Sequence, residues 1–413
     1  MVRLFVYIAL NLLYYNQYML RKLLALILMF SFVSGAARTA CSEPFYMGDS
    51  IDTRWENGIK NMYALDFKAA EEEFRWLLVS NPAHPAGSLA LSCLLWWRMS
   101  QNFDVEQKPF ELENEFFDYA EQATEKSEAM IDTAKSPQIY FTLGTAYGIV
   151  GRWYALQKRW WKAYVYGSKA KKYLDKAVDL NPEAYDAYLG MGIYNYYGDT
   201  IPGVLKLPAL LLIHGDKKKG LEQIRLTAEK GRFFRSEAKL FLIAILVQFE
   251  KKYPEALGIA QSMIAEQPDN VFFQFVEVST RYNSHDWYGA ISSAKEFLSR
   301  HKDSPNDEVQ KLMPLVHLII GNSNLMLQRR SEAMLWLNRA VSETRHPEKG
   351  YVTFAYLRRA QLYDLEGDRA KALDDYAIAA ARPNYWDSKK EAKQGLKKPF
   401  TEEDLYNKIT SID

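Results

Sequence analysis

Residues 360–379 decide the fold, and they read Ala360-Gln-Leu-Tyr-Asp-Leu-Glu-Gly-Asp-Arg-Ala-Lys-Ala-Leu-Asp-Asp-Tyr-Ala-Ile-Ala379. Apolar residues recur with a helical period on both sides of the pair Gly367-Asp368. Glycine tolerates the left-handed backbone that a tight turn between helices needs. Alanine at 360 and at 372 leaves only a methyl group where the two helix axes would meet. The stretch therefore predicts two helices joined by a tight turn and packed closely together.

The same alanine position recurs along the chain, in three places at a fixed distance from a proline. Three alanines lie twelve residues before a proline, in the pairs Ala70 and Pro82, Ala170 and Pro182, Ala256 and Pro268. Further alanines follow at repeat-like spacing, at Ala290, Ala333 and Ala372. This pattern resembles tetratricopeptide repeats, 34-residue helix pairs with small residues where the helices touch. The resemblance implies an all-α, right-handed superhelical solenoid with an inner groove, and we expect about eight helix pairs between Ile51 and Arg382.

A second resemblance covers residues 137–270. Its motif residues are Tyr185, Tyr188, Gly190, Gly192, Tyr194, Asn195, Pro202, Lys206, Leu207, Gly215, Asp216, Lys217, Gly220 and Leu221. The order resembles the repeat-39, or inclusion-body clearance, tetratricopeptide family of the outer mitochondrial membrane. In that family a Gly-x-x-Asn segment precedes a proline-containing apolar stretch and a Gly-Asp-Arg-x-x-Gly-Leu turn, and here Lys217 stands in place of the arginine. The resemblance implies a scaffold or a membrane-associated adaptor with no assigned reaction.

Residues 1–40 have the composition of a targeting segment. A basic pair, Arg21 and Lys22, precedes an apolar run at 23–33, and small residues follow at 34–37. The run is too short to span a bilayer, which needs about 20 apolar residues. We expect a signal peptide cleaved after residue 36 or 37 if translation starts at Met19, or an N-terminal membrane anchor if it starts at Met1. Whether the segment is a cleaved signal peptide or a membrane anchor, it predicts an exported protein that is periplasmic or associated with an envelope membrane.

Cys41 follows this segment, where bacterial lipoproteins carry their lipid. Arg38 stands where a lipoprotein signal has an aliphatic residue, which disfavours lipid attachment at Cys41. The second cysteine is Cys93, and a disulfide between the two is an alternative in an oxidising compartment. Two thiols do not make a disulfide framework.

The predicted solenoid occupies residues 41–383 and contains an apolar insertion at 199–216. Pro202 and Pro208 interrupt its apolar stretch, which is too short to span lipid. Two interpretations remain open for the insertion. It either folds across the groove and fills it, or it covers a ligand or a surface with Lys206 at its polar edge. Residues 384–413 are rich in lysine and predict a basic C-terminal tail with a short helix from Thr401, which either caps the solenoid or hangs loose.

Two aromatic clusters supply the candidate binding residues. The chain has 10 Trp and 27 Tyr, and both clusters belong to its central units. Two roles remain open for these aromatic side chains, packing in the core and lining the groove. If they line the groove, rigid aromatic rings beside cations would suit an extended peptide or an acyl chain. The candidates are Arg152, Trp153, Trp160, Trp161 and Lys162 in the first cluster, Tyr194, Asn195, Tyr196 and Tyr197 in the second, and Lys206 in the insertion.

Charge and motifs exclude several functional classes. The 52 Lys+Arg balance the 51 Asp+Glu, so no excess positive charge favours nucleic acid. The six histidines show no metal-ligand spacing, and we expect no cofactor and no metal. Gly215 and Gly220 have the spacing of a phosphate loop, but Leu221-Glu222 follow where that loop has Lys-Ser or Lys-Thr.

The sequence thus predicts a protein that is not an enzyme. Our leading hypothesis is a protein-binding scaffold or assembly factor of the cell envelope, with protein or peptide partners along the concave face of the solenoid. The alternative is a membrane-associated protein that binds a lipid or an acyl chain through the central insertion and the aromatic clusters.

Overall fold

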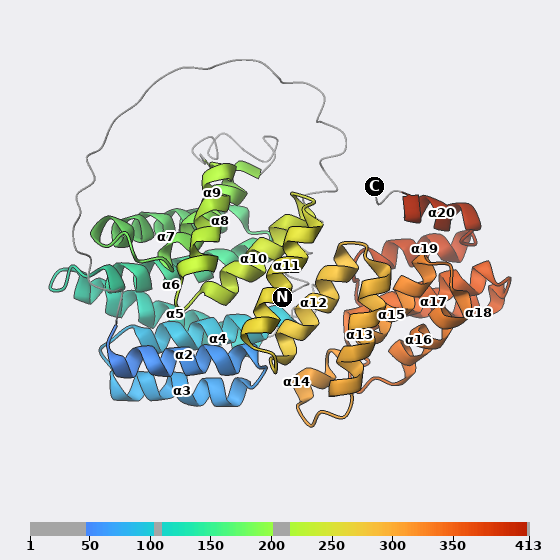
Figure 1. Ribbon diagram of the computed structural model, residues 1–413, viewed down its shortest axis with the longest axis horizontal. Helices are drawn as coiled ribbons and strands as arrows, with labels where there is room; N and C mark the ends of the chain where they lie inside the picture. The colour runs from blue at the N-terminus through green and yellow to red at the C-terminus, as the bar shows by residue number, and fades with distance from the viewer. Residues whose placement is uncertain (1–46, 103–109, 201–214, 411–413) are drawn as a thin grey trace, which may run out of the picture.

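The computed structural model describes residues 47–102, 110–200 and 215–410, and regular structure in these ranges is helical, with no strand (Figure 1). Consecutive helices pack as pairs. The pairs are α2 (Asp49–Tyr63) with α3 (Phe67–Ser80), α4 (Ala86–Asn102) with α5 (Phe110–Ile131), α6 (Pro137–Leu156) with α7 (Trp160–Leu180), α8 (Ala187–Thr200) with α9 (Lys217–Lys230), α10 (Arg235–Gln248) with α11 (Tyr253–Glu266), α12 (Val271–Asn283) with α13 (Trp287–His301), α15 (Met313–Met326) with α16 (Arg330–Ser342), and α17 (Gly350–Leu365) with α18 (Arg369–Ala381). A short helix, α14 (Asp307–Gln310), precedes α15. These pairs confirm the all-α solenoid and its predicted number of units.

The predicted packing alanines lie where the helices of a pair meet. In five second helices the alanine follows the N-cap residue by four positions and is fully buried. They are Ala70, Ala256, Ala290, Ala333 and Ala372. The predicted prolines follow the helix ends, since α3, α7 and α11 each stop two residues before Pro82, Pro182 and Pro268. Proline lacks the amide that would continue the helix.

The third pair departs from this register because both of its helices are longer. The position four residues after the N-cap of α7 is Ala163, so the predicted Ala170 lies two turns further along the helix, where it is still buried. Glycines on α6 let α7 come close along this extra length. A Cβ added to Gly144 would lie 2.7 Å from the Leu174 side chain, and one added to Gly151 would lie 3.2 Å from the backbone nitrogen of Gly167.

The fourth pair explains the spacing that resembles a phosphate loop. Asp216 is the N-cap of α9, where its side chain accepts a hydrogen bond from the Lys219 amide at 2.9 Å. Gly220 follows by four positions, which is the place of the packing alanine. A Cβ there would lie 2.5 Å from the Tyr196 amide nitrogen and 2.8 Å from the Gly192 carbonyl oxygen. Gly220 therefore allows the backbones of α8 and α9 to pack closely against each other.

Replacing Gly220 with alanine should lower the free energy of unfolding by about 2 kcal/mol, because the added methyl group meets backbone atoms that cannot rotate away. The matched control is Gly258→Ala in α11, where a Cβ would meet nothing within 4 Å. That variant should gain about 0.5–1 kcal/mol from the better helix propensity of alanine. Denaturant titration of both variants measures the difference. Equal shifts in the same direction would contradict close packing at Gly220.

The first helix pair closes onto the fifth. Arg232, in the turn before α10, pairs with Asp52 and Glu56 on α2. The rings of Trp55 and Phe233 stack with their centroids 5.1 Å apart. These contacts join the two ends of the first five pairs, and we call helices α2, α4, α6, α8 and α10 the ring.

The first pair also contacts the sixth pair and the residue that precedes α14. The Tyr63 ring lies 5.6 Å from Phe273 on α12, and the Asn306 side-chain amide, just before α14, donates to the Leu65 carbonyl at 3.2 Å. In this part of the chain the predicted groove is thus bridged by side-chain contacts. Side chains of the first unit reach across it to units that are distant in sequence.

The C-terminal segment contains the predicted short helix after Thr401 and a second helix that was not predicted. Two helices form, α19 (Ser388–Lys397) and α20 (Glu402–Thr410), and α19 packs against α17 and α18 (Figure 1). Glu391 on α19 lies 3.0 Å from Lys408 on α20 and 3.5 Å from Arg358 on α17. Opposite charges of Arg358 and Lys408 hold the pKa of Glu391 below its usual value, although burial opposes this. The segment therefore caps the last pair.

Several predictions concern residues outside the described ranges. They are the signal or anchor at 1–40, Cys41, and the centre of the insertion at 201–214, which includes Lys206. Among the helices that the structure describes, none combines the length and the apolar character needed to cross a membrane.

Candidate functional site

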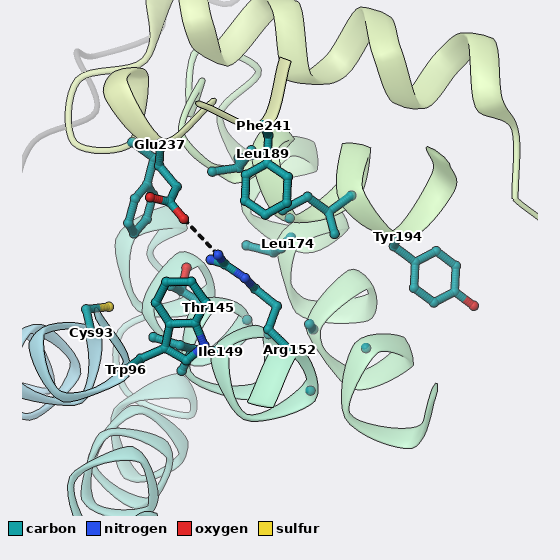
Figure 2. Close-up of a pocket in the computed structure, with 18 of the residues that line it drawn as sticks. Cys93, Trp96, Thr145, Ile149, Arg152, Leu174, Leu189, Tyr194, Glu237 and Phe241 are labelled. Carbon is teal, nitrogen blue, oxygen red and sulfur yellow. Dashed lines mark hydrogen bonds and ion pairs between the residues drawn. The ribbon is translucent and has the colours of Figure 1, made fainter. Parts of the chain in front are cut away.

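The ring lines a partly open cavity of about 280 Å³, close to the lower limit of typical small-molecule pockets (Figure 2). It has two walls, and both carry aromatic side chains, with Trp160, Tyr164, Tyr194 and Tyr197 on the second. The first wall is aromatic and consists of Trp55, Tyr63, Trp96, Trp97, Phe233 and Phe241. The second wall comes from α6, α7 and α8 and is rich in glycine, at Gly144, Gly148, Gly151, Gly167, Gly190 and Gly198. Several of these glycines let the helices of this wall pack closely, since a Cβ at Gly144 or Gly190 would meet the Leu174 side chain.

One ion pair lies in this apolar surrounding. The Arg152 Nη2 donates to Glu237 Oε1 at 2.8 Å (Figure 2). The Tyr63 hydroxyl donates to Glu237 Oε2 at 2.9 Å. The Arg152 guanidinium also covers the Trp96 ring, 3.9 Å from its centroid. The Glu237 side chain is 5% exposed and the Arg152 side chain is 22% exposed, so the carboxylate is buried and the guanidinium is partly open to water. Burial and the neighbouring Glu237 raise the pKa of Tyr63, which keeps its hydroxyl protonated as a donor.

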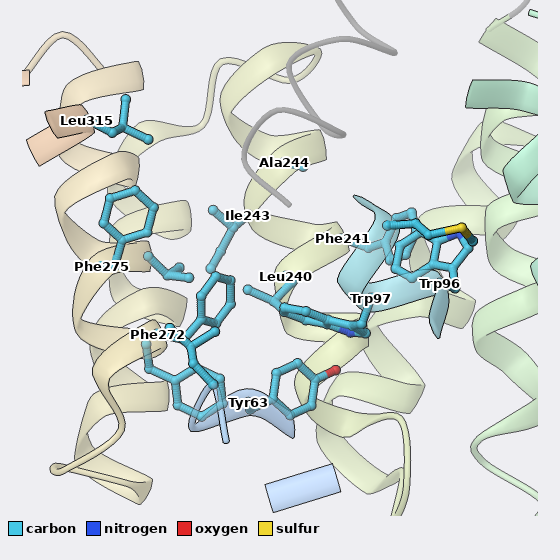
Figure 3. Packing of buried hydrophobic residues seen from close by; sticks show 14 of the residues in the cluster. Tyr63, Trp96, Trp97, Leu240, Phe241, Ile243, Ala244, Phe272, Phe275 and Leu315 are labelled. Atoms are coloured by element: carbon cyan, nitrogen blue, oxygen red, sulfur yellow. The ribbon is translucent and has the colours of Figure 1, made fainter. Parts of the chain in front are cut away.

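Figure 3 shows how the aromatic wall continues into the closure of the ring. Tyr63 and Trp97 lie together beside Leu240 of α10 and Phe272 of α12. The Trp97 ring packs edge-on against Tyr63, at 5.0 Å, and against Phe272, at 5.2 Å. One set of side chains thus both closes the ring and lines the cavity.

Asp186 anchors the turn that closes the ring. It lies between α7 and α8, lines the cavity, and accepts three backbone hydrogen bonds from the amides of Arg232 at 3.1 Å, Phe233 at 3.0 Å and Phe234 at 2.7 Å. Burial raises the pKa of this carboxyl group, and the hydrogen bonds act in the opposite direction. Asp186 therefore fixes the turn that brings Arg232 and Phe233 onto α2.

A cysteine thiol also lines the cavity. Burial raises the pKa of Cys93 to about 12, so the thiol is protonated at neutral pH and is a poor nucleophile. Cys93 is a free thiol, and the described residues contain no group of His, Cys, Asp or Glu side chains that could hold a metal ion. The arrangement is suited to holding an apolar group.

The structure brings four of the predicted site residues to the cavity: Arg152, Trp160, Tyr194 and Tyr197. Arg152 lies at its centre, whereas Tyr194 points away from Arg152 (Figure 2). Trp160 lines the cavity and is 39% exposed, so it marks the rim. Burial raises the pKa of Tyr197 and keeps its hydroxyl neutral.

The other predicted residues lie elsewhere. Three are core residues: the Trp153 indole donates to Glu113 at 2.8 Å, the Asn195 amide donates to Gln223 at 2.7 Å, and the Tyr196 hydroxyl donates to Glu250 at 2.6 Å. Two are on the surface: Trp161 is 57% exposed, and the Lys162 ammonium lies over the Tyr154 ring at 5.0 Å. For the three core residues the structure favours the packing interpretation over the groove interpretation.

Sequence reasoning missed Trp96, Trp97, Tyr63 and Glu237. These residues lie on α2, α4 and α10, far in sequence from both aromatic clusters. One signal was available, because Glu237 is the only carboxylate in the apolar helix 235–248. A lone carboxylate in such a helix needs a partner.

Comparisons with known proteins add little to this description. No family model matches the chain, and no curated protein matches it. Among solved structures, the chain is similar to a tetratricopeptide repeat protein from Parabacteroides merdae, with 12% identity and a TM-score of 0.32 over 85% of this chain and 98% of that chain. It is also similar to the APC/C hetero-tetramer Cut9-Hcn1, with 16% identity and a TM-score of 0.44 over 80% of this chain and 52% of that chain.

The fold is an all-α solenoid of helix pairs. Because identities and TM-scores in these comparisons are low, the assignment rests on the helix pairing and the packing alanines. The resemblance to the repeat-39 family stays a prediction from the sequence.

Proposed function

We propose that this chain is a non-enzymatic scaffold that binds a protein partner at the N-terminal end of α7. The surface consists of Arg159, Trp160, Trp161, Lys162 and Tyr164, and we call it the α7 surface. It adjoins the rim of the cavity, because Trp160 and Tyr164 also line that space.

The observation that carries the proposal is the pair of neighbouring exposed tryptophans. Trp161 is 57% exposed and Trp160 is 39% exposed, and the Trp161 ring lies 5.8 Å from Tyr164. Large exposed apolar side chains in one place mark interaction sites. Trp, Tyr and Arg are the residue types that contribute most binding energy at protein interfaces.

The charge of this surface indicates the chemistry of the partner. Two cations lie close to the Tyr154 ring: the Arg159 guanidinium is 5.1 Å from its centroid and the Lys162 ammonium is 5.0 Å from it. The first turn of α7 has no acidic residue, and its N-cap makes no side-chain hydrogen bond. The partial positive charge of a helix N-terminus adds to these cations. A protein segment with apolar side chains flanked by carboxylates would complement the surface.

The double variant Trp161→Ser with Lys162→Glu should recover at least tenfold less partner than the native chain, because a central interface tryptophan is worth about 2 kcal/mol or more. Neither residue lines the cavity, which should stay intact. Quantitative mass spectrometry after affinity capture from native cells measures recovery.

The matched control is Tyr288→Ser with Arg329→Glu, which removes another exposed aromatic residue and the cation over its ring, 4.9 Å away. Partners that depend on the α7 surface should be retained by this control. Equal loss in both variants, or no loss in either, would contradict the proposal. Capture of lipid vesicles instead of proteins, lost on deletion of residues 201–213, would favour the acyl-chain alternative.

We further propose that the scaffold acts in the cell envelope. This part of the proposal is supported by the composition of residues 1–40, where a basic pair, an apolar run and small residues follow one another. The same mass spectrometry reports the N-terminal residue of the mature chain, and a chain that begins at Met1 or Met19 in the cytoplasm would contradict it.

A further inference from the structure

Two glycines in the second wall of the cavity are explained neither by close packing nor by the backbone. A Cβ added to Gly148 on α6 would meet only the Ala170 Cβ, at 3.6 Å, and one added to Gly167 on α7 would meet only the Tyr194 ring, also at 3.6 Å. Both distances are ordinary van der Waals contacts, so either position has room for a methyl group. Neither glycine has a positive φ. Because glycine inside a helix is less stable than alanine, these two residues keep space free in the cavity at a cost in stability.

The cavity also exposes apolar surface to water inside the ring. Four residues of α6 at helical spacing, Thr145, Gly148, Arg152 and Ala155, line the cavity, and each is half-buried rather than buried. Ile193 on α8 lines it as well and is also half-buried. Apolar surface in contact with water is unfavourable, and contiguous surface of this kind marks binding sites. An apolar molecule in the cavity would cover it.

The charged groups at the cavity do not offer a counter-charge to a ligand. Arg152 and Glu237 form an ion pair that carries no net charge. Both oxygens of Asp186 accept hydrogen bonds from backbone amides of the turn before α10. Transfer of an ion into an apolar space is costly unless the ion is paired there. A polar or charged group of a ligand is therefore best left in water at the rim, where Trp160 is 39% exposed.

Volume sets the length of the apolar part of a ligand. The cavity measures about 280 Å³. In other proteins a dry cavity of about 150 Å³ holds benzene, which has six carbon atoms, so the space here has room for about ten. One leucine or phenylalanine side chain would leave part of it empty. A molecule that fills the interior and keeps its polar group at the rim must also be elongated, as an alkyl chain is.

We propose that the cavity binds the alkyl chain of an amphipathic molecule, with the methyl end inside the ring and the polar head group in water at the rim. Gly148 and Gly167 leave space for the chain, and the half-buried apolar surface of α6 and α8 contacts it. The inference does not depend on the proposed protein partner, because Trp161 and Lys162 lie outside the cavity.

The first test measures how affinity depends on chain length. Hexyl, octyl, decyl, dodecyl and tetradecyl maltoside share one uncharged head group and are titrated, below their micelle concentrations, into the full chain freed of co-purified lipid. Affinity, followed by tryptophan fluorescence, should rise about threefold to fourfold for each methylene up to decyl maltoside. It should then level off, because further methylenes stay in water. Binding should also raise the melting temperature, since a ligand that binds only the folded state stabilises it. No binding by any of the five probes would overturn the proposal, as would an affinity that rises by the same factor up to tetradecyl maltoside.

The second test fills the space with a side chain. Gly148→Leu should weaken binding of decyl maltoside at least tenfold, because the leucine occupies part of the volume that the chain needs. The melting temperature without ligand should stay the same or rise, since leucine has the better helix propensity.

The matched control is Gly258→Leu on α11, an exposed position outside the cavity where a Cβ would meet nothing within 4 Å. This variant should bind decyl maltoside as the native chain does. Unchanged affinity in Gly148→Leu, or an equal loss in Gly258→Leu, would contradict binding in the cavity. If Gly148→Leu fails to fold, the chain-length series on the native chain still decides the proposal.

Discussion

Replacing Glu237 with alanine should lower the free energy of unfolding by about 3 kcal/mol, because it leaves the partly buried Arg152 charge without its partner. The Tyr63 hydroxyl, which donates to the same carboxylate, also loses its acceptor. Guanidinium chloride titration of the full chain, followed by tryptophan fluorescence and by circular dichroism, measures the change. The two signals should shift together if the ring unfolds as one unit.

Two further variants separate the cost of an unpaired charge from the cost of a lost side chain. Glu237→Gln keeps the acceptor oxygen for Tyr63 and should cost less than alanine. The double variant Arg152→Met with Glu237→Leu replaces the ion pair with apolar groups of similar size, and such replacements are often neutral or stabilising. We therefore expect it to be more stable than Glu237→Ala alone. A double variant as unstable as the single one would contradict the role of charge pairing.

Replacing Asp186 with alanine should lower the free energy of unfolding by about 3 kcal/mol, since three backbone amides near the start of α10 lose a buried acceptor. The same turn carries Arg232 and Phe233 onto α2, so the closure of the ring should loosen as well. Hydrogen exchange of the α2 amides, residues 49–63, should therefore become faster in this variant.

Two control variants test whether the effect comes from the Asp186 carboxylate, one at the same position and one in the same loop. Asp186→Asn keeps the oxygen that accepts from Phe233 and Phe234, and should cost only about 1 kcal/mol for the remaining bond. Glu183→Ala removes an exposed carboxylate three residues earlier and should change stability by less than about 0.5 kcal/mol. Slow exchange in α2 despite the loss of Asp186 would show that the turn does not depend on it.

Much of the fold was predictable because it depends on local contacts. The alanines at 70, 256, 290, 333 and 372 mark places where two helices that are consecutive in sequence must touch, and all are fully buried. The prolines at 82, 182 and 268 end their helices by a local steric effect. The sequence analysis rejected the phosphate-loop interpretation of Gly215 and Gly220 but did not identify the packing role of Gly220, because a glycine there takes the place of the packing alanine.

The closed ring was not predictable in the same way. Tyr63 and Glu237 are separated by 174 residues, and Arg232 and Asp52 by 180. A helical period shows which face of a helix is apolar, but it carries no information about which distant helix covers that face. For this reason the sequence predicted a groove but not the contacts that join α2 to α10 across it.

The candidate site was predicted only in part for a related reason. Aromatic residues adjacent in sequence point in different directions on a helix, so Tyr194 and Tyr197 reach the cavity while Tyr196 is buried on the opposite side against Glu250. The same alternation separates Arg152 from Trp153. The partners that complete the site come from α4 and α10, and composition alone does not relate those helices to the aromatic clusters.

The contacts of Tyr63 and Leu65 with α10, α12 and α14 have a consequence for how the chain folds. Repeat arrays in which each unit touches only its neighbours can gain or lose structure one unit at a time. Here the first six units share contacts of long sequence separation, so they gain their stability only together, and their assembly waits for the ends of a long loop to meet. The last two units have no such link to the start of the chain in the contacts described above. We therefore expect helices α15 to α18 to unfold at a lower denaturant concentration than the first six pairs.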